Sequence, residues 1–574
     1  MTDATPPLLP GFARARAPAG PRRRRPVART TARDGGTRAL TEAFSALAAP
    51  RPPSGSGDRT VVVGAGFGGL AAALRLAAEG REVVVLERAA RVGGKARTVE
   101  AGGRAVDAGP TVFTMRWVFE ELFAAAGADL DAAVGLTPAR VLARHAWADG
   151  SRFDLHADLD ETAEAVAALA GPAEADRYRA FARATERAYH LFRPAFIEAP
   201  RPTPLDVLAR IGLRGIPDLF AVRPAANLFA VIADQLHDDR LRQLFARYAT
   251  YCGSSPYRAP ATLALIAHVE RVGVWQVAGG MGALARAIAG LAVARGAAIR
   301  TGVHVEAIET EGGRVAGVRL AGGERIACGA VVFNGDAGAL GAGRLGEAAA
   351  RAVRRIAPER RSLSAVVFSA HAEARGFPLS HHTIFFGPDY RAEFDAMAAG
   401  RPPRDATTYV CALDRDAADG PAPSGPERLH VQINAPARGD THPMTTEEIE
   451  TCRRETEALM RRAGLTLSLS TRTTVTTTPA DFERLFPGTG GALYGEATHG
   501  PNASFFRAGT RTRLKGLYLA GGSTHPGAGV PMAALSGKLA AEALSRDRAS
   551  TPRFRPAATP GGISTPSPTT GSTG

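Results

Sequence analysis

Glycines near the beginning of the chain are spaced so that backbone N–H groups stay open to a ligand. Gly64, Gly66 and Gly69 stand in the order G-x-G-x-x-G, and Gly68 directly precedes the last of them. The first glycine of such a pattern permits a tight turn, the second lets the backbone approach a pyrophosphate, and the third allows close helix–strand packing. Glu87 follows about 20 residues later, where a carboxylate can accept hydrogen bonds from ribose hydroxyls. The spacing therefore predicts a dinucleotide site.

The segments around these glycines have the patterns needed to hold them in place. Residues 60–63 are a short β-branched run, residues 70–78 are rich in Ala and Leu, and residues 82–86 are a second apolar run. Together they predict a βαβ unit whose helix offers free N–H groups and a positive dipole end to phosphates. The acid at position 87 disfavours NADP, because the 2′-phosphate of NADP prefers an arginine.

A second glycine loop follows and distinguishes FAD from NAD. Residues 88–95 read RAARVGGK, so Gly94 and Lys95 lie just beyond the basic residue Arg88. A domain that binds only a nicotinamide nucleotide usually continues directly into its next βαβ unit. A second loop in its place suits a larger cofactor that lies along the domain, and the sequence therefore favours FAD.

A third glycine-rich loop lies near the other end of the chain. A strand pattern at residues 517–520 leads into a loop that contains Gly527 and Gly529, and an Ala-rich helix pattern starts near Pro531. The two glycines would let a ligand approach the backbone at the N-terminus of that helix. If the flavin ring lies there, the helix dipole would stabilise negative charge on it.

The pattern of elements indicates an α/β fold, with a Rossmann-like FAD-binding domain assembled from discontinuous segments and an inserted α+β substrate domain. Strand patterns at 299–308, 314–319 and 330–333 are expected to extend the sheet of the FAD-binding domain. The expected boundaries are 1–57 for a disordered basic extension; 58–115, 268–335 and 508–545 for the FAD-binding domain; 116–267 and 336–507 for the substrate and membrane-associated domain; and 546–574 for a disordered tail.

Positive charge is concentrated at the beginning of the chain. Residues 1–57 contain ten arginines and three acidic residues, which accounts for half of the net charge of +14. Amid Pro and Gly such a segment is expected to be disordered, and it has no apolar region typical of a secretory signal. It is either a basic arm for an anionic membrane surface or a stretch upstream of the native start. Nucleic-acid binding is disfavoured, since aromatic residues do not interleave the arginines.

Residues 203–251 mix apolar side chains with arginines such as Arg210, Arg214 and Arg223. This pattern is typical of a helix that dips into a membrane interface, and equally of a core helix between solvated faces. The chain contains no run of about 18 apolar residues, so a transmembrane helix is not expected.

The cysteines and histidines do not have the spacing of a metal site. The four cysteines are widely separated and form no C-x-x-C pair, which is typical of reduced thiols in a cytosolic protein. His381 and His382 are the only adjacent histidines, and no further ligand stands at metal spacing beside them. We therefore expect no metal.

Taken together, five motifs resemble the bacterial carotenoid desaturases, which are phytoene desaturase-like flavoproteins. The resemblance covers about residues 58–545 and rests on GAGFGGLAAALRL, ERAARVGGKART, DAGPTVF, GVWQVAGGMGALA and YLAGGSTHPGAGVPMAALSGK. The segments DAGPTVFTMRWVF and ATYCGSSPYRAPATL are similar to the branch that acts on hydroxylated or methoxylated acyclic carotenoids. Many other flavoproteins have an acid in the last loop, and Gly522 stands there instead, which weighs against a general amine oxidase.

The resemblance implies FAD-dependent removal of two hydrogens from adjacent carbons of a polyene, at C3–C4 of a 1-hydroxy or 1-methoxy carotenoid. The alternatives are a phytoene desaturase or related polyene desaturase or isomerase, and a non-catalytic flavoprotein that binds carotenoids. Quinone or oxygen would accept the electrons. The FAD contacts that it implies are Gly64, Gly66, Gly68, Gly69, Glu87, Arg88, Gly94, Lys95, Val305, Gly522 and Val530.

The residue that accepts the proton is not identified by any motif. His525 is a candidate by its position in the last loop, and a structural role for this histidine is an equal alternative. A water-insoluble substrate must be drawn from a bilayer, so we expect peripheral attachment on the cytoplasmic side of the bacterial inner membrane.

Overall fold

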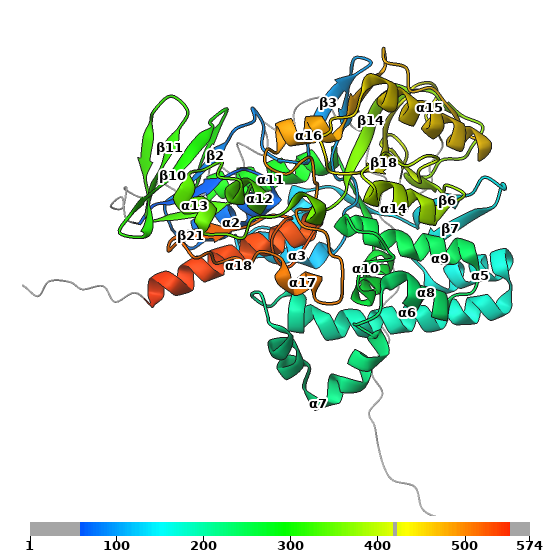
Figure 1. The fold of residues 1–574 in the computed structure, drawn as a ribbon, viewed down its shortest axis with the longest axis horizontal. Coiled ribbons are helices and arrows are strands. Elements are labelled where there is room, and N and C mark those ends of the chain that lie inside the picture. The colour runs from blue at the N-terminus through cyan, green and yellow to red at the C-terminus, as the bar shows by residue number, and fades with distance from the viewer. Residues whose placement is uncertain (1–57, 417–421, 551–574) are drawn as a thin grey trace, which may run out of the picture.

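A computed structural model describes residues 58–416 and 422–550 (Figure 1). The predicted extension at 1–57 lies outside the described residues. So does the tail beyond residue 550, although helix α18 (Val530–Ala549) continues past the expected boundary at 545. Among the described residues, no helix is both long enough and apolar enough to span a bilayer.

A five-stranded parallel sheet forms the centre of one half of the molecule. Its order is β21-β13-β1-β2-β9, and each neighbouring pair is parallel. Its strands come from three separated segments of the chain, as the sequence predicts. They are β1 (Thr60–Val63), β2 (Val83–Glu87), β9 (Ala298–Thr301), β13 (Ala330–Phe333) and β21 (Leu517–Leu519).

Three helices cover this sheet and make the largest core of the FAD-binding half. Helix α2 (Phe67–Ala78) is buried along ten of its twelve residues and packs against α11 (Gly280–Ala294) and α18. The contact between α2 and α18 needs a glycine, because a Cβ on Gly537 would lie 2.2 Å from the carbonyl oxygen of Gly68. The first and last helices of the domain are therefore in direct backbone contact.

The prediction that residues 299–319 extend the parallel sheet is correct only for β9. Strands β10 (Val305–Glu311), β11 (Arg314–Leu320) and β12 (Arg325–Ala327) form a separate antiparallel sheet. Apolar residues of this sheet pack with Val61, Leu86 and Val331 from the parallel sheet. The hairpin thus buries its apolar face against the parallel sheet instead of adding strands at its edge.

A seven-stranded mixed sheet forms the other half, where the sequence predicts an inserted domain. Its order is β20-β14-β18-β17-β16-β6-β7, and only β6 and β16 are paired in parallel. The strands are β6 (Val141–Ala146), β7 (Arg152–His156), β14 (Ser364–Ala372), β16 (His382–Phe385), β17 (Thr408–Ala412), β18 (Glu427–Ala435) and β20 (Thr474–Thr477).

Helices lie below this sheet in the view of Figure 1, and α7 is at the far end of the molecule. Helix α7 is bent where Gly212 leaves the helical conformation, with φ of 63°. The helices of this layer are α5 (Leu159–Ala170), α6 (Pro172–Phe192), α7 (Pro204–Val222), α8 (Leu228–Gln235), α9 (Asp239–Ala246) and α10 (Ile266–Val272).

The remaining α-helices and two-stranded pairs complete the two halves. The helices are α3 (Arg116–Ala124), α4 (Leu130–Ala133), α12 (Ala337–Gly341), α13 (Glu347–Arg351), α14 (Tyr390–Ala398), α15 (Thr446–Arg462), α16 (Pro479–Leu485) and α17 (Ala503–Phe506). The strands, which pair as β3–β4, β5–β8 and β15–β19, are β3 (Thr98–Ala101), β4 (Arg104–Asp107), β5 (Leu136–Pro138), β8 (Trp275–Val277), β15 (Ala374–Arg375) and β19 (Thr466–Leu467).

Candidate active site

A cavity of about 1000 Å³ lies between the two sheets and is lined by both halves of the molecule. Most of the residues that the sequence implicates in cofactor binding line it. Of the predicted site residues, Gly69 and the catalytic candidate His525 do not line the cavity. The predicted cofactor contacts that line it are Gly64, Gly66, Gly68, Glu87, Arg88, Gly94, Lys95, Val305, Gly522 and Val530.

The first glycine turn leaves no room for side chains at Gly66 and Gly69. A Cβ on Gly69 would lie 2.1 Å from the carbonyl oxygen of Gly64, which explains the need for glycine where helix and strand meet. A Cβ on Gly66 would lie 2.8 Å from Nδ2 of Asn334, and Gly64 has φ of 100°. The turn therefore presents bare backbone to the cavity at the N-terminus of α2.

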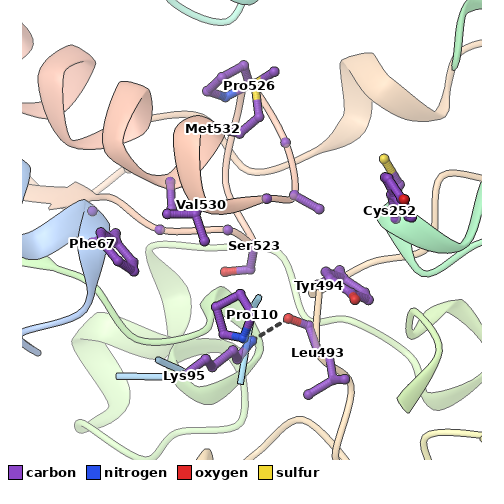
Figure 2. Close-up of a pocket in the computed structure, with 18 of the residues that line it drawn as sticks. Phe67, Lys95, Pro110, Cys252, Leu493, Tyr494, Ser523, Pro526, Val530 and Met532 are labelled. Carbon is purple, nitrogen blue, oxygen red and sulfur yellow. Dashed lines mark hydrogen bonds between the residues drawn. The ribbon is translucent and has the colours of Figure 1, made fainter. Parts of the chain in front are cut away.

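The first and last glycine loops meet at this point. A Cβ on Gly68 would lie 2.6 Å from the backbone nitrogen of Gly521 and 2.6 Å from Oδ1 of Asn334. Nδ2 of Asn334 donates to the carbonyl of Gly64 at 3.3 Å. Figure 2 shows Val530 and Ser523 of the C-terminal loop on one side of the same space and Lys95 and Pro110 on the other.

Glu87 ends β2 at the edge of the cavity and fixes the turn beside it. Its two carboxylate oxygens accept from the backbone nitrogens of Ala65, at 2.7 Å, and Ala89, at 2.8 Å. Val305, on the hairpin sheet, lies buried on the cavity wall in the same region. An acid at the end of the second strand, opposite an apolar residue, is the arrangement that a ribose and an adenine require.

These observations fit FAD. The turn can accept a pyrophosphate because its glycines carry no side chains, the N-terminus of α2 supplies free N–H groups, and Glu87 stands where a ribose would bind. The glycine loop before α18 provides a second backbone surface for the rest of the cofactor.

Comparison with known proteins identifies the family. The model of the flavin-containing amine oxidoreductases matches residues 67–545. A hydroxyneurosporene desaturase from Rubrivivax gelatinosus is 51% identical over 515 residues, which cover 89% of this chain and 98% of that protein. The chain belongs to the carotenoid desaturases of the flavin-containing amine oxidoreductase family. It is an FAD-dependent oxidoreductase.

Further relatives and solved structures agree with this assignment. A hydroxyneurosporene desaturase from Cereibacter sphaeroides is 46% identical, and the match covers 86% of this chain and 99% of that protein. A phytoene dehydrogenase from Streptomyces griseus is 36% identical, and the match covers 87% of this chain and 97% of that protein. A solved oxidoreductase from Methanosarcina mazei has a TM-score of 0.55 at 16% identity and covers 84% of this chain and 100% of that one. At so low an identity, the solved structure confirms the fold alone.

A charged cluster borders the cavity where the desaturase brings its glycine loops together. Nζ of Lys95 donates to the carbonyl of Leu493, as Figure 2 shows, and burial lowers the pKa of Lys95. Burial raises the pKa of Asp336, and the nearby charge of Lys95 partly offsets this rise. Arg507 donates to the carbonyls of Tyr494, at 2.8 Å, and Gly522, at 3.0 Å. Two cationic groups facing one carboxylate favour negative charge on a bound group.

The structure does not support a catalytic role for His525. Its ring is 1% exposed, and Nε2 lies 2.7 Å from the carbonyl oxygen of Ala199. The ring packs edge-on against Phe196, and burial lowers the pKa of the imidazole to about 4. His525 therefore tethers the C-terminal loop to residue 199, and the structural alternative is the one that the packing favours.

The histidine pair has a partner that its sequence spacing does not show. Cys411 lies opposite His382 on the neighbouring strand, and the ligating atoms of His381, His382 and Cys411 lie within 4.8 Å of one another. The histidines are already engaged, since Nδ1 of His382 lies 2.8 Å from the hydroxyl of Tyr409 and Nδ1 of His381 lies 3.0 Å from the carbonyl of Arg415. Both Nδ1 atoms therefore already have a hydrogen-bond partner.

The remaining wall of the cavity is mainly apolar and leads toward α7. Leu208 is both part of this wall and 45% exposed, so the cavity approaches the surface beside this helix. The apolar side chains on this part of the wall are Phe192, Phe196, Val207, Leu208, Leu219 and Leu265.

Sequence reasoning missed three residues of the cofactor end. Asn334 and Asp336 follow β13, the strand beside β1, and the carboxyl ends of neighbouring parallel strands form the edge where ligands bind. That rule would have identified Asn334 and Asp336 as candidates for the site. Arg507 has no comparable signal, because it lies in a loop and reaches the cavity through tertiary contacts.

Proposed function

We propose that the enzyme desaturates an acyclic carotenoid, at the C3–C4 bond of a 1-hydroxy or 1-methoxy substrate such as hydroxyneurosporene. Three relatives named hydroxyneurosporene desaturase, at 44–51% identity over most of the chain, carry this proposal. The phytoene dehydrogenase of Streptomyces griseus, at 36%, is a more distant relative. The higher identity to the first group favours an oxygenated substrate over phytoene.

The cavity is suited to hold a polyene against the cofactor. An allylic C–H bond has no useful acidity, so a side-chain base alone cannot begin the reaction; FAD, when bound, supplies the acceptor for two electrons. The apolar side chains from α6, α7 and α10 would orient the hydrocarbon and exclude water. The glycine loops of α2 and α18 would fix the cofactor at the opposite wall, so that the chain contributes mainly position.

The test is conversion of defined substrates by purified protein with FAD in vesicles. Hydroxyneurosporene and phytoene are supplied separately, with a quinone under anaerobic conditions or with oxygen as electron acceptor, and pigment absorption is followed. We expect hydroxyneurosporene to yield a product that absorbs at longer wavelength. Conversion of phytoene alone would refute the substrate assignment, and bound FAD that no polyene bleaches without oxygen would point to a non-catalytic carotenoid-binding flavoprotein.

We also propose that α7 attaches the enzyme to a membrane surface. The four large apolar side chains that it exposes are Leu205, Leu208, Leu213 and Phe220, with exposures of 77%, 45%, 86% and 75%. Arg210 and Arg214 are exposed on the same helix, where they could contact anionic headgroups. Because α7 also lines the cavity, a carotenoid could pass from the bilayer to the enzyme without crossing water.

Vesicle sedimentation tests this attachment. In the double variant Leu213→Asp/Phe220→Asp we expect binding to anionic vesicles to fall at least about tenfold, since each apolar side chain contributes about 1.5–3 kcal/mol when buried. The matched control is Val272→Asp/Val293→Asp, because these two valines are also exposed, at 60% and 52%, but lie on other helices. An equal loss in both double variants would contradict the proposal.

The same proposal places the enzyme on the cytoplasmic side of the inner membrane of a bacterium. The four cysteines are free thiols, which fits a reducing compartment. Protease treatment of sealed inverted and right-side-out vesicles would decide the side, and cleavage only in right-side-out vesicles would refute it.

A further inference from the structure

The central strand β18 of the seven-stranded sheet turns a polar face to the cavity. Side chains alternate between the two faces of a strand, and β18 lies between β14 and β17. The residues on one face belong to an apolar core shared with α15, and they are Leu429, Val431 and Ile433. The residues on the other face line the cavity, and they are His430, Gln432 and Asn434. Polar groups in such a place are costly without partners, so this face indicates a ligand with a polar atom.

Gln432 is the residue of this face that opens most clearly to the cavity. It is partly exposed although its backbone is paired on both sides, with Val367 and Tyr409, so the exposed surface belongs to its side chain. The amide has one hydrogen-bond partner among the described residues, Nε2 of His430, which lies 3.3 Å from Oε1. The other end of the amide has no such partner, and it is not among the unpartnered polar atoms that the protein encloses. It is therefore free to contact a ligand.

His430 determines which end of the Gln432 amide faces the cavity. Burial lowers the pKa of His430, so its ring is uncharged and carries one proton. Nδ1 lies 3.2 Å from the carbonyl oxygen of Asp107, which can only accept, so the proton belongs on Nδ1. Nε2 is then an acceptor and needs a donor. With the amide turned so that its N–H₂ meets Nε2, all three groups are satisfied and the amide oxygen faces the cavity.

This oxygen lies beside a segment that reaches the cofactor end. Tyr409 stands directly opposite Gln432 in the sheet, and its hydroxyl lies 2.6 Å from Oγ1 of Thr111. Thr111 follows Pro110, which Figure 2 shows beside Lys95. A ligand atom bound to Gln432 would therefore lie on the cofactor side of the cavity.

We propose that Gln432, oriented by His430, accepts a hydrogen bond from the hydroxyl at the polar end of the polyene and so selects a hydroxylated substrate over a methoxylated one and over a hydrocarbon. This inference rests on the proposed function, in which the oxygen on C1 lies close to the reacting C3–C4 bond. A hydroxyl has the proton that the amide oxygen needs, whereas an ether oxygen has none. A methoxy or hydrocarbon end therefore leaves the oxygen of Gln432 unpaired, which is the basis of the discrimination.

The test compares equilibrium binding of hydroxyneurosporene, methoxyneurosporene and the parent hydrocarbon neurosporene. The FAD of the purified enzyme is first reduced with dithionite under anaerobic conditions, so that a bound polyene is not desaturated. The coloured polyene that the enzyme retains after removal of detergent micelles is then measured. We expect the wild type to prefer hydroxyneurosporene over each of the other two about threefold to tenfold, the range for one hydrogen bond between neutral groups.

Gln432→Met removes the amide oxygen at similar side-chain length, and both preferences are expected to fall to near unity. The matched control is Thr250→Val, because Thr250 also lines the cavity but its hydroxyl already donates to the carbonyl of Arg247 at 2.7 Å. We expect this control to keep both preferences. FAD content and the thermal midpoint of each variant verify that the fold is intact.

Substitutions of His430 test its positioning role. In His430→Leu the amide of Gln432 can present its N–H₂ as well as its oxygen, so an ether oxygen also finds a donor. We expect the preference for the hydroxylated over the methoxylated polyene to disappear, while both stay preferred over neurosporene. His430→Gln, whose side-chain oxygen can accept in place of Nε2, is expected to keep the wild-type order. If His430→Leu loses FAD, the Gln432→Met result decides.

The outcomes separate this inference from the proposed function. Desaturation of hydroxyneurosporene with a preference that Gln432→Met does not alter would overturn the inference and leave the function standing. Preferential binding that Gln432→Met abolishes, without turnover of any polyene, would support the inference and refute the function. A loss of FAD affinity in Gln432→Met with unchanged polyene preference would overturn the inference and assign the amide oxygen to the cofactor. A wild type that binds the methoxylated polyene as tightly as the hydroxylated one would overturn it whatever its activity.

Discussion

The two ends of the cavity present different kinds of polar group. At the cofactor end, the glycines at positions 64, 66 and 68 bring backbone to the surface, and a Cβ on Gly68 would meet the backbone of Gly521. At the substrate end, buried side chains such as Arg247, Glu270 and Tyr390 provide the polar atoms. A backbone site depends on the absence of side chains, whereas a side-chain site depends on which ones the fold brings together.

This contrast has consequences for substitution. At Gly68 and Gly69 the cofactor end tolerates no added atoms, because the nearest neighbours include backbone groups that cannot turn away. The substrate end tolerates changes of shape but not the loss of one member of an ion pair, because the other charge would remain buried without compensation.

The largest effect is expected at the glycine turn. In Gly69→Ala the new Cβ would lie 2.1 Å from the carbonyl oxygen of Gly64, so α2 must move away from β1 and distort the phosphate site. We expect the purified variant to contain essentially no FAD, measured by flavin absorbance per protein. Gly290→Ala in α11 is the control, since no atom lies within 4 Å of the added Cβ. FAD retained by Gly69→Ala would show that the turn is not the cofactor site.

The next largest effect is expected on stability, from breaking the buried ion pair between Arg247 and Glu270. Glu270→Leu leaves Arg247 buried without its counter-charge, and we expect the free energy of unfolding to fall by about 3–5 kcal/mol. Denaturant unfolding followed by far-UV circular dichroism measures the change. Glu324→Leu, which removes the exposed partner of Arg300, is expected to have no measurable effect. Equal stability of the two variants would mean that the buried pair does not hold the substrate end together.

The stability of the protein is expected to depend on pH through Glu393, a buried residue of α14. Burial raises the pKa of Glu393 to about 7, while the backbone nitrogen of Thr407 donates to its Oε2 at 3.1 Å. Between pH 4.5 and 7, Glu393 binds more protons in the folded state than in the unfolded state. The free energy of unfolding therefore falls as the pH rises through that window. The total decrease is roughly 3 kcal/mol. Thermal midpoints of the wild type from pH 5 to 8 should decline relative to those of Glu393→Gln; parallel profiles would contradict the assignment.

The smallest effect is expected from Asn334, which connects the glycine loops through its side chain. Asn334→Ala removes the hydrogen bond to the carbonyl of Gly64 but adds no clash. We expect FAD affinity to fall about fivefold to tenfold, corresponding to about 1 kcal/mol for one hydrogen bond, as measured by titration of the apoprotein. A loss as large as that of Gly69→Ala would show that the side chain, and not the bare backbone, determines cofactor binding.

The sequence predicted the glycine turn and the strands beside it well because this information is local. The spacing of Gly64, Gly66 and Gly69 between a strand and a helix gave the turn, and Glu87 gave the end of the next strand. The same reasoning placed β10 and β11 in the parallel sheet, which was wrong, because the alternation of apolar residues does not show which surface a hairpin will cover. It also offered His525 as a catalytic candidate, and the structure shows the imidazole hydrogen-bonded to residue 199 outside the cavity.

The sequence by itself determined the βαβ unit and its glycine turn, because the residues that specify both are neighbours in the chain. The tertiary structure alone decided that the last glycine loop closes on the first, and that Arg247, Glu270, Tyr390 and Thr407 line the same cavity. These four residues come from different parts of the chain. Neither their proximity nor their burial is encoded in local spacing, because both arise only when distant segments pack together.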